Sequence, residues 1–386
     1  MKSNTHSIDI LSQLIAFDTT SRNSNLDIID FIQSILEPWG IQSELTFDTG
    51  KNKANLFATL GDSKQSGLVL SGHTDVVPVD DQDWNSDPFK AEIRDSRMYG
   101  RGVCDMKGFI AICLTRIEQI LNADLSTPIH FAFSFDEEVG CLGVRELLSA
   151  LKKKPVLPKA CIIGEPTSMG VIRAHKGMLF KRCCVRGKSA HSSLVHQGVN
   201  AVTVASKIIS HIDAMQRRIQ KEGPFDEAFE PPYTTLHSGV ITGGTVNNII
   251  PSHCQFDFEI RNLPEQQTLP IFEELDGYVR TQLIPEMHGI DPETGVDWMD
   301  VAEYPGMNTA KDEAVISLVS ELLGFNDEPG KVSYGTEGGH FQRHGIPTVI
   351  CGPGSIEQAH KPDEFVDLDQ IDQGEKFISS LIESLT

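Results

Sequence analysis

Four apolar segments of this sequence each run into residues that can bind a metal ion or move a proton. Short segments that are apolar throughout are typical of strands buried in a parallel sheet. Ligands of open α/β sheets bind outside the carboxyl ends of such strands, so we expect the side chains that follow these segments to gather at one edge. These side chains are His73 and Asp75, Glu137 and Glu138, Glu165, and His360.

A fifth segment, Tyr99 to Gly108, places Asp105 in a glycine-rich loop just before an expected helix. Several carboxylates brought within a few ångströms repel one another and take up protons unless cations neutralise them. Two imidazoles and three carboxylates offer only nitrogen and oxygen donors, which suit a pair of divalent ions of the zinc or cobalt class. The residues therefore predict a dinuclear metal site with one bridging carboxylate, for which Asp105 is the candidate.

Each of these residues, taken alone, also has an ordinary structural interpretation. A single histidine after a strand is usually a hydrogen-bonded loop residue, and a Glu-Glu pair is usually the solvated start of a helix. Gly164-Glu165-Pro166-Thr167 alone is typical of a turn. The combination of all the segments is what favours the metal site.

The elements that must position these residues follow two patterns. In residues 1–178 and again in 303–386, helical and strand-like segments alternate, which predicts a largely parallel sheet covered by helices. Residues 179–302 instead follow the order β-α-β-β-α-β, which is typical of ferredoxin-like domains. We therefore predict an α/β metal-binding domain (1–178 and 303–386) that is interrupted by an inserted α+β domain (179–302).

The spacing of apolar residues gives these elements approximate bounds. In the α/β domain we expect helices over 7–17, 26–39 and 312–323, another after Lys107, and strands over 55–60, 67–70, 129–135, 160–163 and 347–351. In the inserted domain we expect strands over 180–186, 235–241, 255–261 and 296–301, and helices over 199–219 and 269–283.

The composition narrows the class of protein. Lys plus Arg number 33 and Asp plus Glu number 54, which gives a formal net charge of −21. Nucleic acids and anionic membranes repel such a surface. The alternative interpretation is that the negative charge only keeps the protein soluble. No apolar run approaches the ~18 residues of a membrane span, and residues 1–6 lack the apolar core of a signal peptide. Eight cysteines without a Cys-x-x-Cys pair indicate reduced thiols in a cytoplasmic protein.

The motifs around the predicted metal site resemble those of the dinuclear-zinc aminoacylase and carboxypeptidase family, which also includes succinyl-diaminopimelate desuccinylase. The resemblance extends from about Ile8 to the C-terminus. The segments that carry it are Ser71 to Pro78, Gly100 to Gly108, Asp136 to Gly140, and Gly164 to Thr167. Further segments narrow it to members that remove an acetyl group, namely 133–141, 174–177, 335–339 and 359–364.

This resemblance implies a role for each residue at the strand ends. Asp105 bridges two divalent ions, zinc or cobalt, and the peptide bond that follows it is expected to be cis. His73 and Glu165 bind the first ion, and Glu138 and His360 bind the second.

The resemblance also implies three catalytic residues that bind no metal. Asp75 accepts the other N–H of the His73 imidazole and so fixes its tautomer. Glu137 is the general base that deprotonates the attacking water and later protonates the leaving amine. His191 donates to the oxyanion in the site of a neighbouring subunit, which implies a homodimer that forms through the inserted domain; the alternative is an ordinary turn histidine.

Substrate recognition is the least specified part of the resemblance. Arg261 matches an arginine that binds the substrate α-carboxylate, to which Asn247 and Asn248 are also expected to donate. Glu337 is a candidate for binding a distal ammonium, and its alternative reading is a solvated loop acid.

We therefore expect a cytoplasmic dimetal amidohydrolase that converts the small molecule N2-acetyl-L-ornithine to L-ornithine and acetate in arginine synthesis. The nearest alternative is a related N-acyl-amino-acid hydrolase or desuccinylase. A catalytically inactive relative that only binds metal or ligand is disfavoured by the intact Glu137, and a purely structural interaction protein by the metal-type residues at the strand ends.

Overall fold

The computed structural model describes residues 4–386, so the first three residues of segment 1–6, which lacks the apolar core of a signal peptide, lie outside the described residues. The chain forms two compact units. The first contains the chain up to Ala174 together with Met307–Lys331 and Thr336–Thr386, and the second contains His175–Gly306 and Val332–Gly335. The residue patterns had placed the corresponding boundaries at 178/179 and 302/303, without the short segment 332–335.

The first unit contains a nine-stranded sheet in the order β1-β2-β6-β3-β7-β15-β8-β13, with β14 paired to β8. Its four central strands β6, β3, β7 and β15 are parallel to one another, and β2 and β8 flank them in antiparallel orientation. This mainly parallel sheet confirms the predicted fold class. The strands are β1 (Ser43–Phe47), β2 (Ala54–Leu60), β3 (Leu68–His73), β6 (Ile129–Ser134), β7 (Ala160–Ile163), β8 (Ile172–His175), β13 (Met307–Asn308), β14 (Gly330–Val332) and β15 (Thr348–Ile350).

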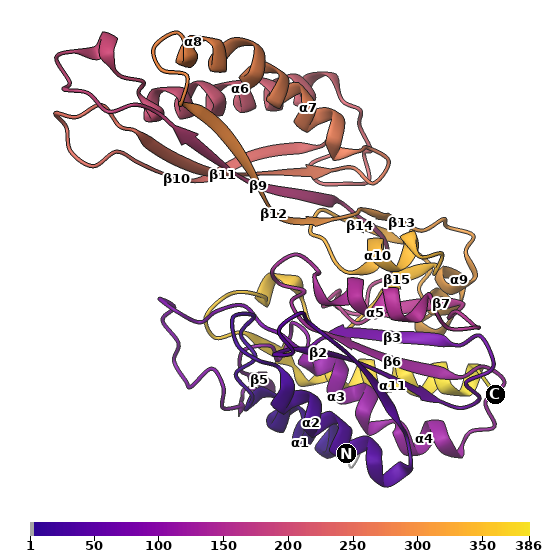
Figure 1. Ribbon diagram of the computed structural model, residues 1–386. Coiled ribbons are helices and arrows are strands. Elements are labelled where there is room, and N and C mark those ends of the chain that lie inside the picture. Colours follow the sequence, from indigo (N-terminus) through magenta and orange to yellow (C-terminus); the bar gives the residue numbers. More distant parts are fainter. Residues whose placement is uncertain (1–3) are drawn as a thin grey trace. The chain divides into compact units, whose positions relative to one another are not determined.

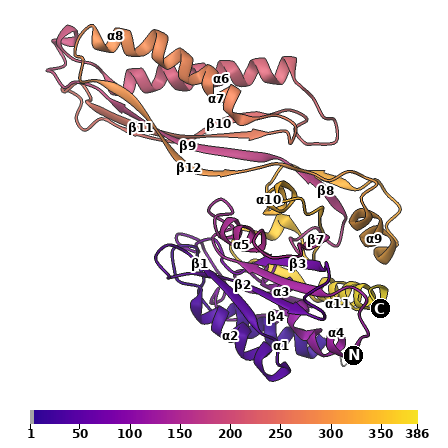
Figure 2. The ribbon, with the colours of Figure 1, turned by 45° about the vertical axis from the view of Figure 1, so that its right-hand side comes forward.

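Helices cover both faces of this sheet (Figures 1 and 2). Helices α1, α2, α3, α4 and α11 lie on one face, where their apolar residues form the main core with the strands, and α5 and α10 lie on the other. Such two-sided burial explains why the central strands are apolar throughout. The helices are α1 (Asn4–Ile15), α2 (Leu26–Leu36), α3 (Lys107–Thr115), α4 (Ile117–Asn122), α5 (Gly143–Leu151), α9 (Ala314–Leu323), α10 (Gly338–Arg343) and α11 (Leu368–Ser384).

A small three-stranded sheet, in the order β16-β5-β4, also belongs to the first unit. It pairs a hairpin that precedes Asp105 with a strand that follows His360. Its strands are β4 (Glu92–Arg94), β5 (Arg97–Tyr99) and β16 (Phe365–Asp367).

The second unit has the predicted β-α-β-β-α-β order and one antiparallel sheet, β10-β11-β9-β12. Its helices lie together on one face of that sheet (Figure 1), where α6 and α7 pack on alternate residues of β11. The elements are β9 (Gly177–Arg186), α6 (Ala201–Glu222), β10 (Thr235–Gly243), β11 (His253–Asn262), α7 (Thr268–Tyr278), α8 (Ile284–His288) and β12 (Gly295–Tyr304).

Two observations concern the whole described chain. Among residues 4–386, no helix is both long enough and apolar enough to cross a membrane. All eight cysteines are free thiols, and all but Cys184 are buried.

Candidate metal centre

The parallel strands of the first unit bring the predicted residues to one edge of the sheet. His73 is the last residue of β3, and Glu165 follows the end of β7 closely. The pair Glu137-Glu138 follows the end of β6, and a longer loop leads from β15 to His360. Neighbouring parallel strands end at the same edge, so these side chains meet there although they are far apart in the sequence.

Asp105 lies between two histidines. Its Oδ1 is 3.0 Å from Nε2 of His73, and its Oδ2 is 3.4 Å from Nε2 of His360. Glu165 Oε1 lies 3.8 Å from Nε2 of His73, and Glu138 Oε2 lies 3.0 Å from Nε2 of His360. Each histidine therefore faces one oxygen of Asp105 and one glutamate.

The peptide bond between Asp105 and Met106 is cis, which confirms that expectation. The loop continues into α3, whose first residue, Lys107, is fully buried. The Lys107 ammonium donates to the carbonyl oxygens of Leu14 and Phe17 at 3.1 and 2.9 Å. It thereby ties the start of α3 to the end of α1 and the loop that follows it.

Repulsion and burial dominate the electrostatics of this cluster. Burial and the Asp105 carboxylate raise the pKa values of Glu138 and Glu165. Hydrogen bonds to Asp105 and Glu138 raise the pKa of His360 to about 10, and the same neighbourhood raises the pKa of His73 although burial opposes its charged form. The raised pKa values of the glutamates and of the imidazoles both oppose an accumulation of negative charge in the cluster, and its nitrogen and oxygen donors have the chemistry that divalent cations require.

Two further groupings bear on which residues bind metal. One ligand atom each of His73, Glu137 and Glu165 lie within 4.8 Å of one another, and so do one each of His73, Asp105 and Glu138. The carboxylate of Glu137 is therefore as close to His73 and Glu165 as a third metal ligand would be.

Asp75 supports the cluster in a different way from the one predicted. The Nδ1 atom of His73 bonds to the main-chain carbonyl of Asp75 at 2.9 Å, whereas the Asp75 carboxylate is 3.7 Å from it. That carboxylate instead accepts the main-chain N–H groups of Glu137 and Glu138, at 3.0 and 3.3 Å, and the hydroxyl of Ser21 at 2.7 Å. In this structure the carbonyl oxygen, and not the carboxylate, is thus at hydrogen-bond distance from Nδ1 of His73, and the carboxylate orients the main chain of Glu137 and Glu138.

Glu137 lies in a strongly perturbed environment. Burial, with Glu138 and Glu337 nearby, raises the pKa of its carboxyl group well above the ordinary value although His73 acts in the opposite direction. The thiol of Cys141 also donates to Glu137 Oε1 at 3.4 Å. A carboxyl group of raised pKa can both accept and return a proton near neutral pH.

The remaining predicted residues of the inserted region lie in the second unit. His191 is exposed and forms an isolated β-bridge with Ile249, next to Asn247 and Asn248, which are also exposed. The main-chain N–H of Ser192 donates to the Asn248 carbonyl oxygen at 3.0 Å. The structure therefore brings the His191 loop and the two asparagines together.

Arg261 lies at the end of β11 and already has partners within the second unit. Its Nε and Nη2 donate to the two oxygens of Glu259 at 3.0 and 3.1 Å, and its Nη1 donates to the Tyr304 hydroxyl at 3.2 Å. A substrate carboxylate would have to share this guanidinium with Glu259.

Glu337 belongs to the first unit and is only 1% exposed. The Ser71 hydroxyl of β3 donates to its Oε2 at 3.4 Å. Burial, together with Asp75, raises the pKa of Glu337 to about 7. The alternative reading of Glu337 as a solvated loop acid is therefore wrong, because the carboxyl group packs against the central strand.

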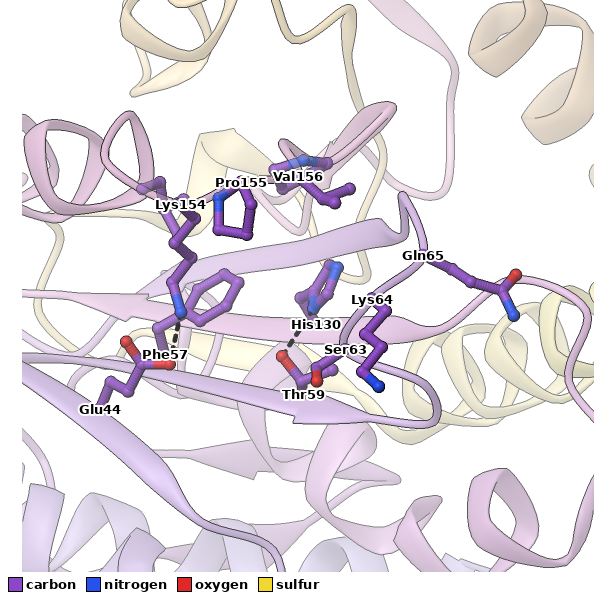
Figure 3. A pocket seen from close by; sticks show the side chains of 12 residues that line it. Glu44, Phe57, Thr59, Ser63, Lys64, Gln65, His130, Lys154, Pro155 and Val156 are labelled. Atoms are coloured by element: carbon purple, nitrogen blue, oxygen red, sulfur yellow. Dashed lines mark hydrogen bonds and ion pairs between the residues drawn. The ribbon is translucent and has the colours of Figure 1, made fainter.

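A separate cavity of the first unit, of about 460 Å³, is drawn in Figure 3. His130 in this cavity stands near the start of β6, and its Nδ1 lies 2.9 Å from Thr59 Oγ1. Burial lowers the pKa of His130 to about 4, so its imidazole is neutral near pH 7. Because the metal-type residues follow the last residue of β6, this cavity is not part of their cluster.

Comparisons with known proteins agree with this geometry. Residues 69–384 match the model of peptidase family M20/M25/M40. The acetylornithine deacetylase of Pasteurella multocida is 34% identical to this chain, over 97% of each of the two chains. The acetylornithine deacetylase of Myxococcus xanthus is 35% identical, over 94% of this chain and 92% of the relative. A metallo-carboxypeptidase of the M20 family from Sulfolobus solfataricus has the same fold, with a TM-score of 0.78 at 17% identity over 99% of each chain. Aminopeptidase PepT of Bacillus cereus gives a TM-score of 0.75 at 21% identity, also over 99% of each chain.

The raised pKa of Glu337 leads to a prediction for the metal-free protein. A carboxyl group with a higher pKa in the folded than in the unfolded chain stabilises the fold less as the pH rises. As the pH rises from 4.5, the ordinary pKa, to about 7, the pKa in the folded protein, the unfolding free energy of wild type should fall by about 3 kcal/mol relative to that of Glu337→Gln. Above pH 7 the difference between the two proteins should stay constant. Urea unfolding from pH 4 to 8 measures this, with Glu118→Gln on the exposed side of α4 as the control for removing one charge. A difference that does not vary with pH would contradict the raised pKa.

Proposed function

This chain belongs to peptidase family M20/M25/M40, and from that premise we propose that it hydrolyses N2-acetyl-L-ornithine to L-ornithine and acetate, as a cytoplasmic enzyme of arginine synthesis. The observation that carries the proposal is the near full-length similarity to acetylornithine deacetylases, joined to a cluster in which Asp105 lies between two histidines. Hydrolysis of an amide bond is the chemistry of this family, and the acetyl amide is the bond in question here.

The residues assigned to hold two divalent ions, zinc or cobalt, are those whose donor atoms converge. Asp105 would be shared by the two ions, His73 and Glu165 would complete one site, and Glu138 and His360 would complete the other. The distances of 3.0 to 3.8 Å between these donors support the assignment. The chemistry that such a pair supplies when bound is polarisation of the acetyl carbonyl and a hydroxide near neutral pH.

Glu137 acts as the base in this proposal. Its carboxylate takes the proton of the attacking water and returns it to the amine nitrogen as the amide bond breaks. The Asp75 carboxylate fixes the position of Glu137 through the main-chain N–H groups of Glu137 and Glu138. The raised pKa of Glu137 suits a group that must hold the proton between the two steps.

Residues of the second unit are assigned to the substrate and to the oxyanion. Arg261 binds the α-carboxylate with help from Asn247 and Asn248, and the buried Glu337 of the first unit accepts the distal ammonium. The main-chain N–H of Ser193 donates to Nδ1 of His191 at 3.2 Å, so in the neutral imidazole Nε2 carries the proton. His191 is thereby prepared to donate to a developing oxyanion, and we assign this role to the active site of the partner in a homodimer that forms through the inserted domain.

The substrate assignment is tested with a panel of N-acyl amino acids after zinc or cobalt reconstitution. We expect the highest kcat/KM for N2-acetyl-L-ornithine, a lower value for N-acetyl-L-methionine, and the lowest for N-succinyl-diaminopimelate. The Glu337→Gln variant should lose more activity on acetylornithine than on acetylmethionine, since only the former has an ammonium group. Higher kcat/KM on acetylmethionine or on the succinyl compound in wild type would make the chain a different member of the family.

The role of Glu137 is separated from metal binding by substitution. Glu137→Ala should keep two ions per chain and lose about 10²-fold or more in kcat, the scale of a lost general base. His73→Ala and His360→Ala should instead lose bound metal, which elemental analysis of the dialysed protein measures. If Glu137→Ala lost an ion while the turnover per remaining ion held, Glu137 would be a ligand.

The exchange of His191 between subunits is tested by complementation of two inactive variants. In a mixed dimer of His191→Ala and Glu137→Ala, one site receives an intact Glu137 from the first chain and an intact His191 from the second. Co-refolded variants should therefore regain activity that neither shows alone. No regain, with mixed dimers confirmed by native mass spectrometry, would place His191 within its own subunit's site or outside catalysis.

A further inference from the structure

A buried carboxylate far from Asp105 in the sequence holds the loop that carries it. One oxygen of Glu364 accepts the main-chain N–H groups of Cys104 and Asp105 at 2.9 and 3.0 Å. The other accepts the main-chain N–H of Gly102 at 3.0 Å and Nη1 of Arg101 at 2.7 Å. Glu364 and Arg101 are each 1% exposed, so every one of these donors compensates the burial of the charge.

The same group of residues also holds the loop that carries His360. Glu364 lies on that loop, shortly after His360. Arg101 donates through Nη1 to the Lys361 carbonyl oxygen at 3.3 Å and through Nη2 to the side-chain oxygen of Gln82 at 2.6 Å. The side-chain nitrogen of Gln82 donates in turn to the carbonyl oxygen of His360 itself, at 3.1 Å.

The two histidines of the candidate centre are therefore held in different ways. His73 ends a central strand and is fixed by the ladders of β3 with β6 and β7. His360 belongs to no strand or helix, its backbone has a φ of +64°, and its side chain is 55% exposed. The pairing of β5 with β16 joins the two segments next to these loops, and within the loops the contacts of Gln82, Arg101 and Glu364 tie His360 to Asp105.

We propose that Glu364, Arg101 and Gln82 are positioning residues that set the distance between Asp105 and His360, and so determine the affinity for the second metal ion. This inference rests on the dinuclear site of the proposed function. Residues that hydrogen-bond to a metal ligand, without binding the metal themselves, lower the metal affinity about 10- to 100-fold when they are removed. Gln82 contacts His360 directly and reaches the Asp105 loop only through the Arg101 side chain, whereas Glu364 accepts the main-chain N–H of Asp105 itself.

Gln82→Ala is the first test, because it removes the link to His360 and leaves the buried pair of Arg101 and Glu364 in place. The zinc-loaded full chain is dialysed against buffers of graded free zinc, and the zinc per chain is measured by elemental mass spectrometry. We expect the first ion to be retained as in wild type, and the second to be lost at a free zinc concentration about 10-fold higher or more. Gln65→Ala, whose exposed amide contacts Asp62 on another loop, is the matched control and should behave as wild type.

Glu364→Gln is the second test. Each Glu364 oxygen accepts at least two donors, so the amide nitrogen must face donors whichever way it turns. We expect both ions to bind more weakly in this variant, since the bridging Asp105 shifts as well.

The outcomes distinguish this inference from the proposed function. A wild type that never holds two zinc ions would contradict the dinuclear site itself, before any substitution is made. A second ion bound equally well by wild type and Gln82→Ala would overturn the positioning role. So would equal weakening of both ions in Gln82→Ala, provided that the melting temperature of its metal-free form matches wild type.

Discussion

Repulsion among the carboxyl groups at one edge of the central sheet is the constraint on which the rest of this structure depends. The carboxyl groups of Asp105, Glu138 and Glu165 meet there largely shielded from solvent. Burial and the Asp105 carboxylate raise the pKa values of the two glutamates. Such a cluster is maintained only if cations balance it and if the surrounding backbone holds it in place. The imidazoles, the buried loop contacts and the parallel strand order all serve that requirement.

Two kinds of support hold the cluster, and they differ in rigidity. Parallel strands fix His73 and bring Glu165 near it, because their hydrogen-bond ladders define the position of each residue. Loops carry Asp105 and His360, and there the Glu364 carboxylate and the Arg101 guanidinium hold the backbone through side-chain hydrogen bonds. A buried ion pair is weak evidence for stability in itself. Its use here is geometric, because it joins two loops that carry donors of one site.

The sequence predicted the parts of the site that have a local signal. His73 and Glu165 each follow an apolar strand, and the strand predicted at 160–163 has the observed bounds. The contacts of Glu364 with residues 101–105 join segments about 260 positions apart, and neither segment has a local pattern that names its partner. The bond of His73 to the Asp75 carbonyl was not predicted for the same reason, because the donors that hold the Asp75 carboxylate come from two other segments, at Ser21 and at Glu137 and Glu138. Helix α11 was not predicted, nor was the small sheet of β4, β5 and β16.

The two histidines proposed for opposite tasks differ in which main-chain group faces Nδ1. In His73 the Asp75 carbonyl oxygen faces Nδ1, so that nitrogen must donate, and the neutral ring presents a lone pair at Nε2, as a metal ligand requires. In His191 the Ser193 N–H donates to Nδ1 at 3.2 Å and the Ser193 hydroxyl lies 2.8 Å from the same nitrogen; with Nδ1 as the acceptor, Nε2 carries a proton that can be donated. Asp75 and Ser193 each lie two residues beyond their histidine. The local turn therefore selects the tautomer, and the tautomer separates a metal-binding histidine from a hydrogen-bond donor of the same residue type.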